Sequence, residues 1–264
     1  VLRLVFTKNP NKVINNFLFS KKSILGTMAV AAVCMLGTGN AQAQEFTIQG
    51  DLVSSYVWRG IYQGGAASFQ PTLGFSVGNF SLTAWGSTSL SESNKEIDLT
   101  AAYKFGEAGP TLSVASLWWN GQADVANGEL TNDYFHFKSG DTGHHFEAGL
   151  AYTLPVEKFP LSIAWYTMFA GQDKNAEGGQ NYSSYVEFNY PFRVRMVDLN
   201  VTCGMVPYAA PQYNCDGFAV TNVALKGTTQ IRFTDKFALP VFAQAVWNPR
   251  MEDAHLVFGI TLKP

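Results

Sequence analysis

The sequence predicts an all-β fold, a transmembrane antiparallel up-and-down β-barrel of about 12 strands. Three observations support this prediction: apolar and polar residues alternate along most of the chain, short and long connections follow each other in turn, and charged residues are scarce. Charged residues make up 14% of the chain and aromatic residues another 14%, whereas soluble domains usually contain about 25% charged residues. The alternative is a soluble β-sandwich, whose apolar faces would point inward.

Residues 21–43 have the organisation of a secretory signal peptide. Lys21 and Lys22 precede an apolar run from Ile24 to Leu36, and the small residues around Ala43 follow it. The run is shorter than the ~20 residues that a transmembrane helix needs. We therefore divide the chain into an N-terminal extension with a signal peptide, residues 1–43, and an outer-membrane β-barrel, residues 44–264.

The charge balance of the exported part limits its partners. Five of the 18 basic residues and none of the 20 acidic residues precede Gln44, so this part carries 13 bases against 20 acids, a net charge of −7. A net negative charge argues against nucleic acid as a partner. We expect a location in the bacterial outer membrane, contacts with its lipid and with small hydrophilic solutes or ions, and no cofactor. The oligomeric state is left open.

The first three strands show the alternation most clearly. The segment 46–59 has apolar residues at Phe46, Ile48 and Leu52, with polar residues such as Asp51 between them. Successive side chains of a strand point to opposite faces, so this segment has one apolar and one polar face. The alternation resumes at 69–77 and 80–90, which flank a tight turn at residues 78–79.

The rest of the chain continues as nine similar runs. They are residues 96–105, 111–119, 144–154, 161–170, 182–190, 197–206, 218–233, 239–247 and 255–262. Each has aliphatic or aromatic residues at every second position and polar or small residues between them. The phase is least regular in 111–119, where Leu117 falls on the polar face. The prediction is therefore twelve strands in all, an even number that places both termini on one side.

The connections between these segments alternate in character. Residues 78–79, 106–110, 155–160, 191–195 and 234–238 are tight, whereas 60–68, 91–95, 120–143, 171–181, 207–217 and 248–254 are mostly longer and rich in polar and small residues. Short turns at one end and long loops at the other are typical of a bacterial outer-membrane barrel. Aromatic residues near strand ends are expected to form interface girdles: Trp58, Phe105, Trp118, Trp165, Tyr190 and Trp247.

Short aromatic segments cluster in the first hairpins. They are Ser55 to Gln63 (Ser-Tyr-Val-Trp-Arg-Gly-Ile-Tyr-Gln), Phe69-Gln70-Pro71, Gly78-Asn79-Phe80 and Trp85-Gly86-Ser87, and similar pieces occur at Glu96 to Tyr103 and at Tyr190-Pro191-Phe192. These segments resemble the TorF-type porin family over most of residues 45–205. The resemblance implies an outer-membrane barrel with a pore. The chain departs from the usual barrel ending, because Lys263 and Pro264 follow Leu262 instead of a terminal aromatic residue.

The polar face is where we expect the function to lie. Ten charged residues fall on it and are predicted to line the pore: Asp51, Arg59, Glu96, Asp98, Lys104, Glu147, Glu187, Asp198, Lys226 and Arg232. A barrel of about 12 strands can leave a narrow water path or fill its interior with side chains. The sequence predicts a narrow passive channel for small hydrophilic solutes, selected by pore width and lining charge. The alternative is a plugged structural or adhesive barrel braced by internal ion pairs.

No motif in the sequence predicts covalent chemistry or a metal site, so we expect that the protein is not an enzyme. An outer-membrane lipid hydrolase is the alternative, because His255 shares the lumen face with several serines. His144 and His145 are strand neighbours that point to opposite faces and cannot chelate one ion together. The segment 120–143 carries acidic residues, but it lacks the regular spacing of a calcium loop.

Cys203 and Cys215 flank the connection 207–217. Reflecting this hairpin about Ala209 places the two cysteines opposite each other, and opposed antiparallel residues have Cα atoms within disulfide range. The oxidising compartment outside the inner membrane permits the bond. We therefore predict a disulfide, with two unpaired cysteines as the alternative.

Overall fold

The computed structural model describes residues 44–264, except 65, 121, 124–129, 132, 138–141 and 236. The predicted signal peptide within residues 1–43 lies outside this range. Among the described residues, no helix is long and apolar enough to cross a membrane.

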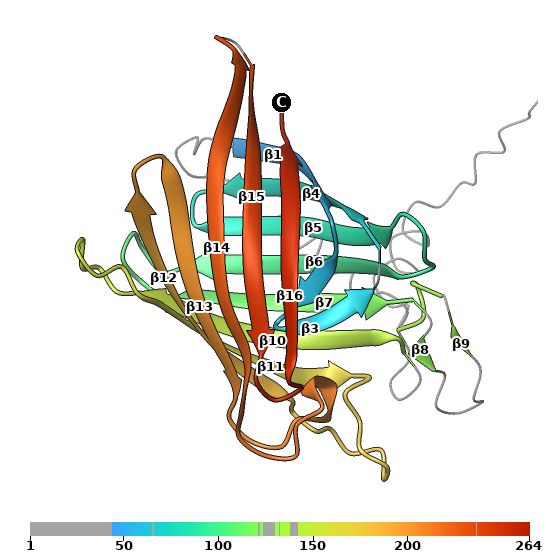
Figure 1. Cartoon of the computed structure of the whole chain (residues 1–264). Coiled ribbons are helices and arrows are strands. Elements are labelled where there is room, and N and C mark those ends of the chain that lie inside the picture. Colours follow the sequence, from blue (N-terminus) through green and yellow to red (C-terminus); the bar gives the residue numbers. More distant parts are fainter. Residues whose placement is uncertain are drawn as a thin grey trace, which may run out of the picture. The chain divides into compact units, whose positions relative to one another are not determined.

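Twelve strands form a closed antiparallel barrel, as the alternation predicts (Figure 1). They are β1 (Gln44–Val53), β4 (Ser68–Val77), β5 (Phe80–Ser89), β6 (Lys95–Lys104), β7 (Thr111–Trp119), β10 (His144–Thr153), β11 (Ser162–Gly171), β12 (Ser184–Val194), β13 (Val197–Val206), β14 (Ala219–Thr234), β15 (Phe237–Asn248) and β16 (Asp253–Leu262). Each wall strand pairs with its neighbours along the chain, and β16 closes the ring against β1. The twelve-stranded fold is confirmed.

Two short hairpins form separate two-stranded sheets that do not pair with the barrel strands. The strands β2 (Tyr56–Trp58) and β3 (Ile61–Gly64) pair with each other, and so do β8 (Gln122–Ala123) and β9 (Leu130–Thr131). A single turn of 3-10 helix, η1 (Pro211–Tyr213), lies in the connection from β13 to β14.

The barrel turns its apolar face outward. On β6 the neighbours Glu96 and Ile97 are 2% and 40% exposed, and on β1 Phe46 is 72% exposed. A soluble sandwich would bury such apolar residues in its core. Charged side chains inside and apolar side chains outside are the arrangement of a barrel that is surrounded by lipid.

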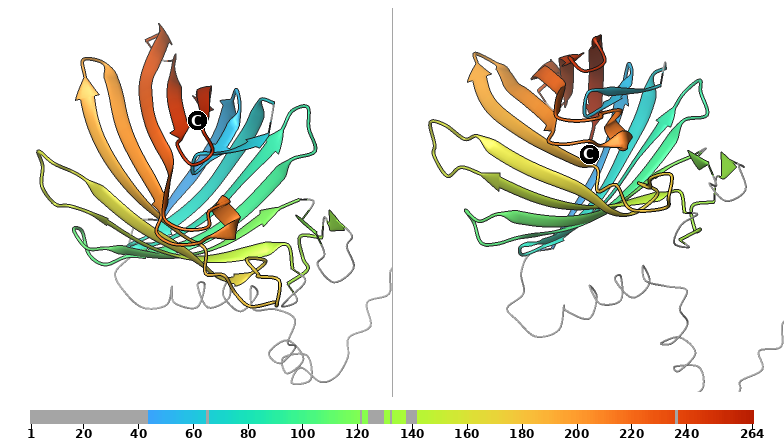
Figure 2. Two further views of the ribbon diagram at one scale, coloured as in Figure 1. Left: turned by 60° about the horizontal axis from the view of Figure 1, so that its bottom comes forward. Right: turned by 90° about the horizontal axis from the view of Figure 1, so that it is seen from below.

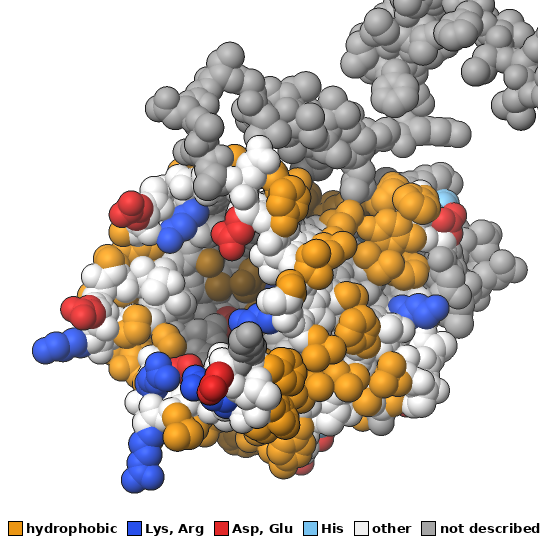
Figure 3. Space-filling model, turned by 90° about the horizontal axis from the view of Figure 1, so that it is seen from above, with side chains coloured by type: hydrophobic (Ala, Val, Ile, Leu, Met, Phe, Trp, Pro, Cys, Tyr) orange, Lys and Arg blue, Asp and Glu red, His pale blue; other side chains and the backbone are white. Residues whose placement is uncertain are grey.

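The seam between the first and last strands is short. β1 pairs with β16 from Gly50 to Val53, whereas it pairs with β4 over its whole length. In Figure 2 the red C-terminal strands lie beside the blue first strand. An apolar hollow of about 590 Å³ lies along this region, and its lining includes Leu52, Phe258 and Ile260. The space-filling view from above shows a hollow with basic and acidic side chains around it (Figure 3).

The first strand is shorter than predicted. It ends at Val53 instead of residue 59, and the residues that continue its alternation form the β2–β3 hairpin inside the ring (Figure 1). Trp58 is therefore not a girdle residue, because it packs against buried residues of the interior. The girdle prediction is also wrong for Trp118, which is 4% exposed. Trp165, Trp247 and Phe105 are exposed, which fits the prediction.

Candidate functional site in the barrel lumen

The β2–β3 hairpin crosses the lumen and carries Arg59 at its tip. Arg59 and Gly60 have φ values of 49° and 84°, and two successive residues in the left-handed region are typical of a tight hairpin turn. A Cβ atom on Gly60 would collide with the carbonyl oxygen of Thr221 in β14. The side-chain amide of Asn248 in β15 donates to the Gly60 carbonyl at 3.0 Å. The tip is therefore held against wall strands far from the hairpin in sequence.

Arg59 forms a buried ion pair across the lumen. Its two terminal nitrogens donate to the two carboxylate oxygens of Glu147 in β10, at 2.6 and 2.8 Å. It also donates to the hydroxyl of Tyr213, at 2.5 Å. The side chains of Arg59 and Glu147 are 13% and 5% exposed. Bidentate charge-assisted pairs of this kind fix geometry as well as contributing energy.

Aromatic rings surround the Arg59 guanidinium. Its central carbon lies 4.4 Å from the ring centroid of Tyr166, 4.8 Å from Trp58 and 4.9 Å from Tyr185. Tyr213 stacks on Trp58 at 5.3 Å between centroids and lies 5.7 Å from Tyr185. Cation–π contacts of this kind are strongest where water is excluded. The hairpin tip is therefore fixed by charge and by packing together.

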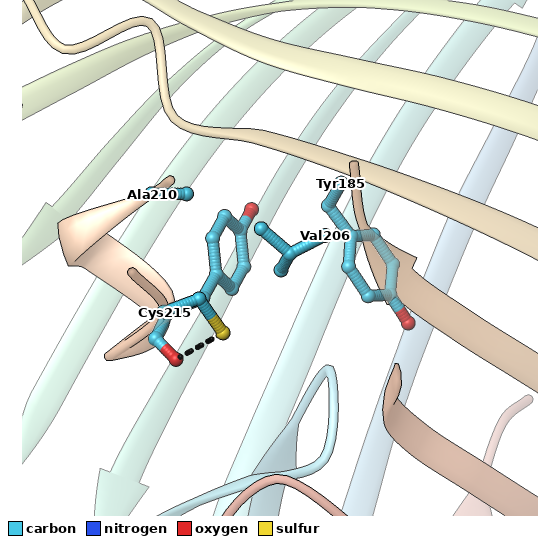
Figure 4. Close-up of a cluster of buried hydrophobic side chains, with 5 residues drawn as sticks. Tyr185, Val206, Ala210 and Cys215 are labelled. Atoms are coloured by element: carbon cyan, nitrogen blue, oxygen red, sulfur yellow. Dashed lines mark hydrogen bonds between the residues drawn. The ribbon is translucent and has the colours of Figure 1, made fainter. Parts of the chain in front are cut away.

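The connection 207–218 folds inward and completes this closure. Tyr213, Ala210 and Cys215 form a buried cluster with Tyr185 and Val206 (Figure 4). The backbones of Ala210 and Cys215 exchange two hydrogen bonds, at 2.8 and 3.2 Å. Burial raises the pKa of the Tyr213 hydroxyl and of the Cys215 thiol, so both stay neutral at physiological pH. We call the hairpin 56–64 and the connection 207–218 together the lumen plug.

The disulfide prediction is wrong, because both cysteines in the described part of the chain are free. Cys203 lies opposite Val223 in the β13–β14 pairing, whereas Cys215 lies in the lumen plug and donates from its thiol to the carbonyl of Tyr213 at 3.3 Å. The reflection about Ala209 assumed a symmetric hairpin. The connection instead leaves the sheet, which separates the two thiols.

The ten predicted pore-lining residues fall into three groups. Arg59 belongs to the lumen plug. Glu96, Asp98, Glu147, Glu187, Asp51 and Lys226 lie in wall strands with buried or half-buried side chains, and Lys104, Asp198 and Arg232 are exposed near the ends of their strands. Asp198 pairs with Arg193 at 3.3 Å in an exposed ion pair. The structure therefore brings together Arg59 and Glu147, and it leaves the last three residues away from the plug.

A polar network lines the lumen along β12 and β13. Glu187 accepts hydrogen bonds from the Tyr185 hydroxyl at 2.7 Å and from the Asn189 amide at 2.6 Å. The Asn189 oxygen in turn accepts from Asn200 and Thr202, at 2.9 and 2.7 Å. Lys226 lies over the Phe242 ring at 4.0 Å, and Asp51 accepts from Thr261 at 2.6 Å. These polar side chains can form hydrogen bonds with water in a narrow passage.

The neighbouring residues His144 and His145 of β10 point to opposite faces of the wall, as the alternation of a strand predicts. His145 packs on Trp119 of the lumen at 5.1 Å, whereas His144 packs on Tyr134 and Phe146. The Ser116 hydroxyl lies 2.8 Å from His144 Nδ1, and His144 Nε2 donates to the Tyr134 carbonyl at 2.6 Å. A serine beside an oriented histidine is the geometry of a nucleophile and its base. Ser116 and His144 are 7% and 0% exposed, however, and the hydrogen bond from His144 to the Tyr134 carbonyl ties the connection after β7 to the wall.

His255, which the sequence places on the lumen face together with several serines, contacts an acidic residue and an aromatic ring. Its Nε2 lies 3.1 Å from a carboxylate oxygen of Asp253, and its ring stacks on Tyr62 at 5.0 Å. Within the described residues no serine hydroxyl bonds to it. The sequence therefore placed His255 on the lumen face correctly, and the structure gives it a contact with the β2–β3 hairpin.

Comparison with known proteins adds little to this picture. No family model and no curated protein matches the chain. Among solved structures, the COG4313 outer membrane channel from Pseudomonas putida F1 is 12% identical, with a TM-score of 0.40 over 85% of this chain and 97% of that chain. The translocator domain of the autotransporter NalP from Neisseria meningitidis is 11% identical, with a TM-score of 0.35 over 89% and 92%. The resemblance to TorF-type porins stays a prediction.

Proposed function

We propose that the protein is a bacterial outer-membrane channel for small hydrophilic solutes or ions, and that the lumen plug sets the width of its passage. The observation that carries the proposal is the orientation of the wall: Ile97 and Phe46 are exposed on the outside while Glu96 is buried inside. Such a barrel is stable in lipid, since all its strands are paired in a closed ring. Outer-membrane lipid is therefore its proposed surroundings.

The polar lumen favours a channel over a scaffold. Glu187, Asn189 and Thr202 form one hydrogen-bonded row on the inner face, and an interior that serves only stability can be filled with apolar side chains. Selectivity in such a passage would come from its width and from the charges that line it.

The Arg59–Glu147 pair also favours a second candidate function, a plugged structural or adhesive barrel. The pair and its aromatic neighbours close part of the lumen with contacts that resemble a protein core. A plug of this kind can be permanent or can move. We propose no enzymatic activity, because Ser116 and His144 are buried under side chains of the connection that follows β7.

Single-channel recording in planar bilayers tests the proposal and separates the two candidates. Val53 and Ser68 are paired neighbours in the wall, so a short Gly-Ser turn can join them and remove the hairpin 56–64. We expect small conductance steps for the wild type and larger steps for this hairpin-less variant. A silent wild type with a conducting variant would show a plug that is closed at rest, and silence of both would support the structural barrel.

A further inference from the structure

Two carboxylates at one end of the lumen lack a counter-ion. Glu96 is 2% exposed, and neither of its carboxylate oxygens accepts a well-formed hydrogen bond from the described residues; the same holds for one oxygen of Asp98. The two side chains share the inner face of β6, two positions apart. Arg59 is the nearby base, but its guanidinium is held by Glu147. A buried charge without a partner is costly, so these carboxylates form an incomplete site.

Glu96 faces a cavity of about 230 Å³ between the β2–β3 hairpin and the wall strands β4 to β7. Aromatic side chains form much of its lining: Tyr56 and Trp58 from the hairpin, and Trp119 from β7. Trp58 and Trp119 meet edge to face at 5.5 Å. The indole N–H of Trp119 lies beside the Glu96 carboxylate, without a well-formed hydrogen bond to it or to another described residue.

Several other polar groups of this cavity already have partners. The amide of Asn94 donates to the Gln63 carbonyl at 2.8 Å, and the amide of Asn120 donates to the Ser93 carbonyl at 2.5 Å. The hydroxyl of Ser87 accepts from Gln70 at 3.3 Å. Lys95 lies at the cavity with an exposed side chain, so its ammonium group can remain in water. The groups available to a ligand beside Glu96 therefore include its carboxylate, aromatic faces and one indole N–H.

We propose that this cavity binds a small hydroxylated organic cation, such as an amino alcohol with a substituted ammonium group. The ammonium group would lie against Glu96 and the faces of Tyr56, Trp58 or Trp119, because aromatic rings attract cations whose charge is shielded by methyl groups. A ligand hydroxyl would accept from the Trp119 indole. The inference does not depend on conduction, since it rests on the cavity and its unpartnered groups alone.

Calorimetric titration of the purified, detergent-folded protein with choline tests this proposal. We expect saturable binding of choline, weaker binding of tetramethylammonium, which lacks the hydroxyl, and no measurable binding of 3,3-dimethylbutan-1-ol, the neutral isostere of choline. Equal binding of the neutral isostere would show a site for uncharged solutes and would overturn the cation assignment. Absence of choline binding up to about 100 mM would overturn the site, since even a millimolar dissociation constant corresponds to a measurable affinity.

Variants locate the binding. Glu96→Gln keeps the shape of the side chain and removes its charge, and we expect about tenfold weaker choline binding or more. Trp119→Leu should weaken binding as well. Asp198→Asn is the matched control, because Asp198 is 66% exposed, pairs with Arg193 and lies outside both the cavity and the lumen plug; its affinity should stay within about twofold of the wild type. Unchanged affinity in Glu96→Gln, with the folded band retained on a detergent gel, would overturn the proposal.

Discussion

Arg59 and Glu147 lie 88 positions apart in the sequence and meet inside the lumen through two hydrogen bonds of 2.6 and 2.8 Å. Arg59 comes from an inward hairpin and Glu147 from the opposite wall, so the pair fixes the position of the hairpin tip. If the passage widens beside the hairpin tip, either the Arg59–Glu147 pair must break or Glu147 must move together with the hairpin. The lumen plug can therefore be tested by removing the charges one at a time.

Removing one partner of this pair should destabilise the barrel and widen the passage. Arg59→Met leaves the Glu147 carboxylate buried without its base, and breaking a buried ion pair typically costs about 3–5 kcal/mol of unfolding free energy. The double variant Arg59→Met with Glu147→Leu should recover part of this loss, because no charge is then left unpaired. Urea unfolding followed by tryptophan fluorescence measures the free energy of unfolding of the single and the double variants. Strictly additive losses in the double variant would contradict a direct interaction.

A methyl group on Gly60 should displace the hairpin tip without changing any charge. Its Cβ would collide with the Thr221 carbonyl, and its φ of 84° is unfavourable for alanine. We expect Gly60→Ala to conduct more than the wild type in planar bilayers. Gly106→Ala is the matched control, because Gly106 has a φ of 71° and nothing within 4 Å of the new methyl group. It should lose stability through backbone strain alone and keep the wild-type conductance.

Closure of the strands should make the fold resistant to detergent. Every wall strand pairs on both sides, so no free edge remains for the detergent to separate. Unheated and boiled samples should migrate differently on a detergent gel, and the protein should fractionate with outer membranes. Identical migration, combined with recovery in the soluble periplasm, would contradict the membrane location.

Both cysteines of the barrel should be free thiols. Labelling of denatured, unreduced protein should modify Cys203 and Cys215, and a Cys203→Ser variant should retain one reactive thiol. In the folded protein Cys215 should react slowly, because it is 4% exposed and burial raises the pKa of its thiol. A raised pKa lowers the fraction of Cys215 that is thiolate, the form that reacts with the label. The rate of Cys215 labelling should therefore increase as the pH is raised. A denatured, unreduced sample without reactive thiols would show that Cys203 and Cys215 form a disulfide after all.

The wall strands could be predicted because alternation is a local property of the sequence. The inner face of β6, with Glu96 and Asp98, follows from counting alone. The β2–β3 hairpin could not be predicted in this way, because Tyr56 and Trp58 continue the alternation of β1. Its inward position depends on contacts such as that between Gly60 and Asn248, which are 188 positions apart.

Leu117 was the one local signal of the lumen plug. It is an apolar residue on the polar face of β7, and it packs with Ala115 and Met168 beneath Trp58. An apolar group inside the lumen indicates that something apolar covers it. The pairing of Arg59 with Glu147 could not be predicted, although both were assigned to the lumen face. Which charges meet inside a barrel depends on the stagger of its strands and on the path of its connections.

Lumen charge should set the ion preference of the channel. Asp98, Glu187 and Lys226 are inner-face residues, and the acids outnumber the base. Charges that face a narrow and poorly hydrated passage act at a low effective dielectric, so each has more effect there than on the surface. We expect a mild preference for cations in the wild type and a greater one in Lys226→Gln. Neutralising two acids, in the double variant Asp98→Asn with Glu187→Gln, should shift the preference toward anions.

Reversal potentials under a salt gradient measure this preference. Asp198→Asn is the matched control, because Asp198 lies on the same phase but is 66% exposed and paired with Arg193 at its strand end. Screening by salt water should make its effect small, so this variant should keep the wild-type reversal potential. The double variant must also keep the folded gel band, which separates a change in selectivity from a loss of structure. An anion-selective wild type, or a double variant with an unshifted potential, would mean that these acids do not line the narrowest part of the passage.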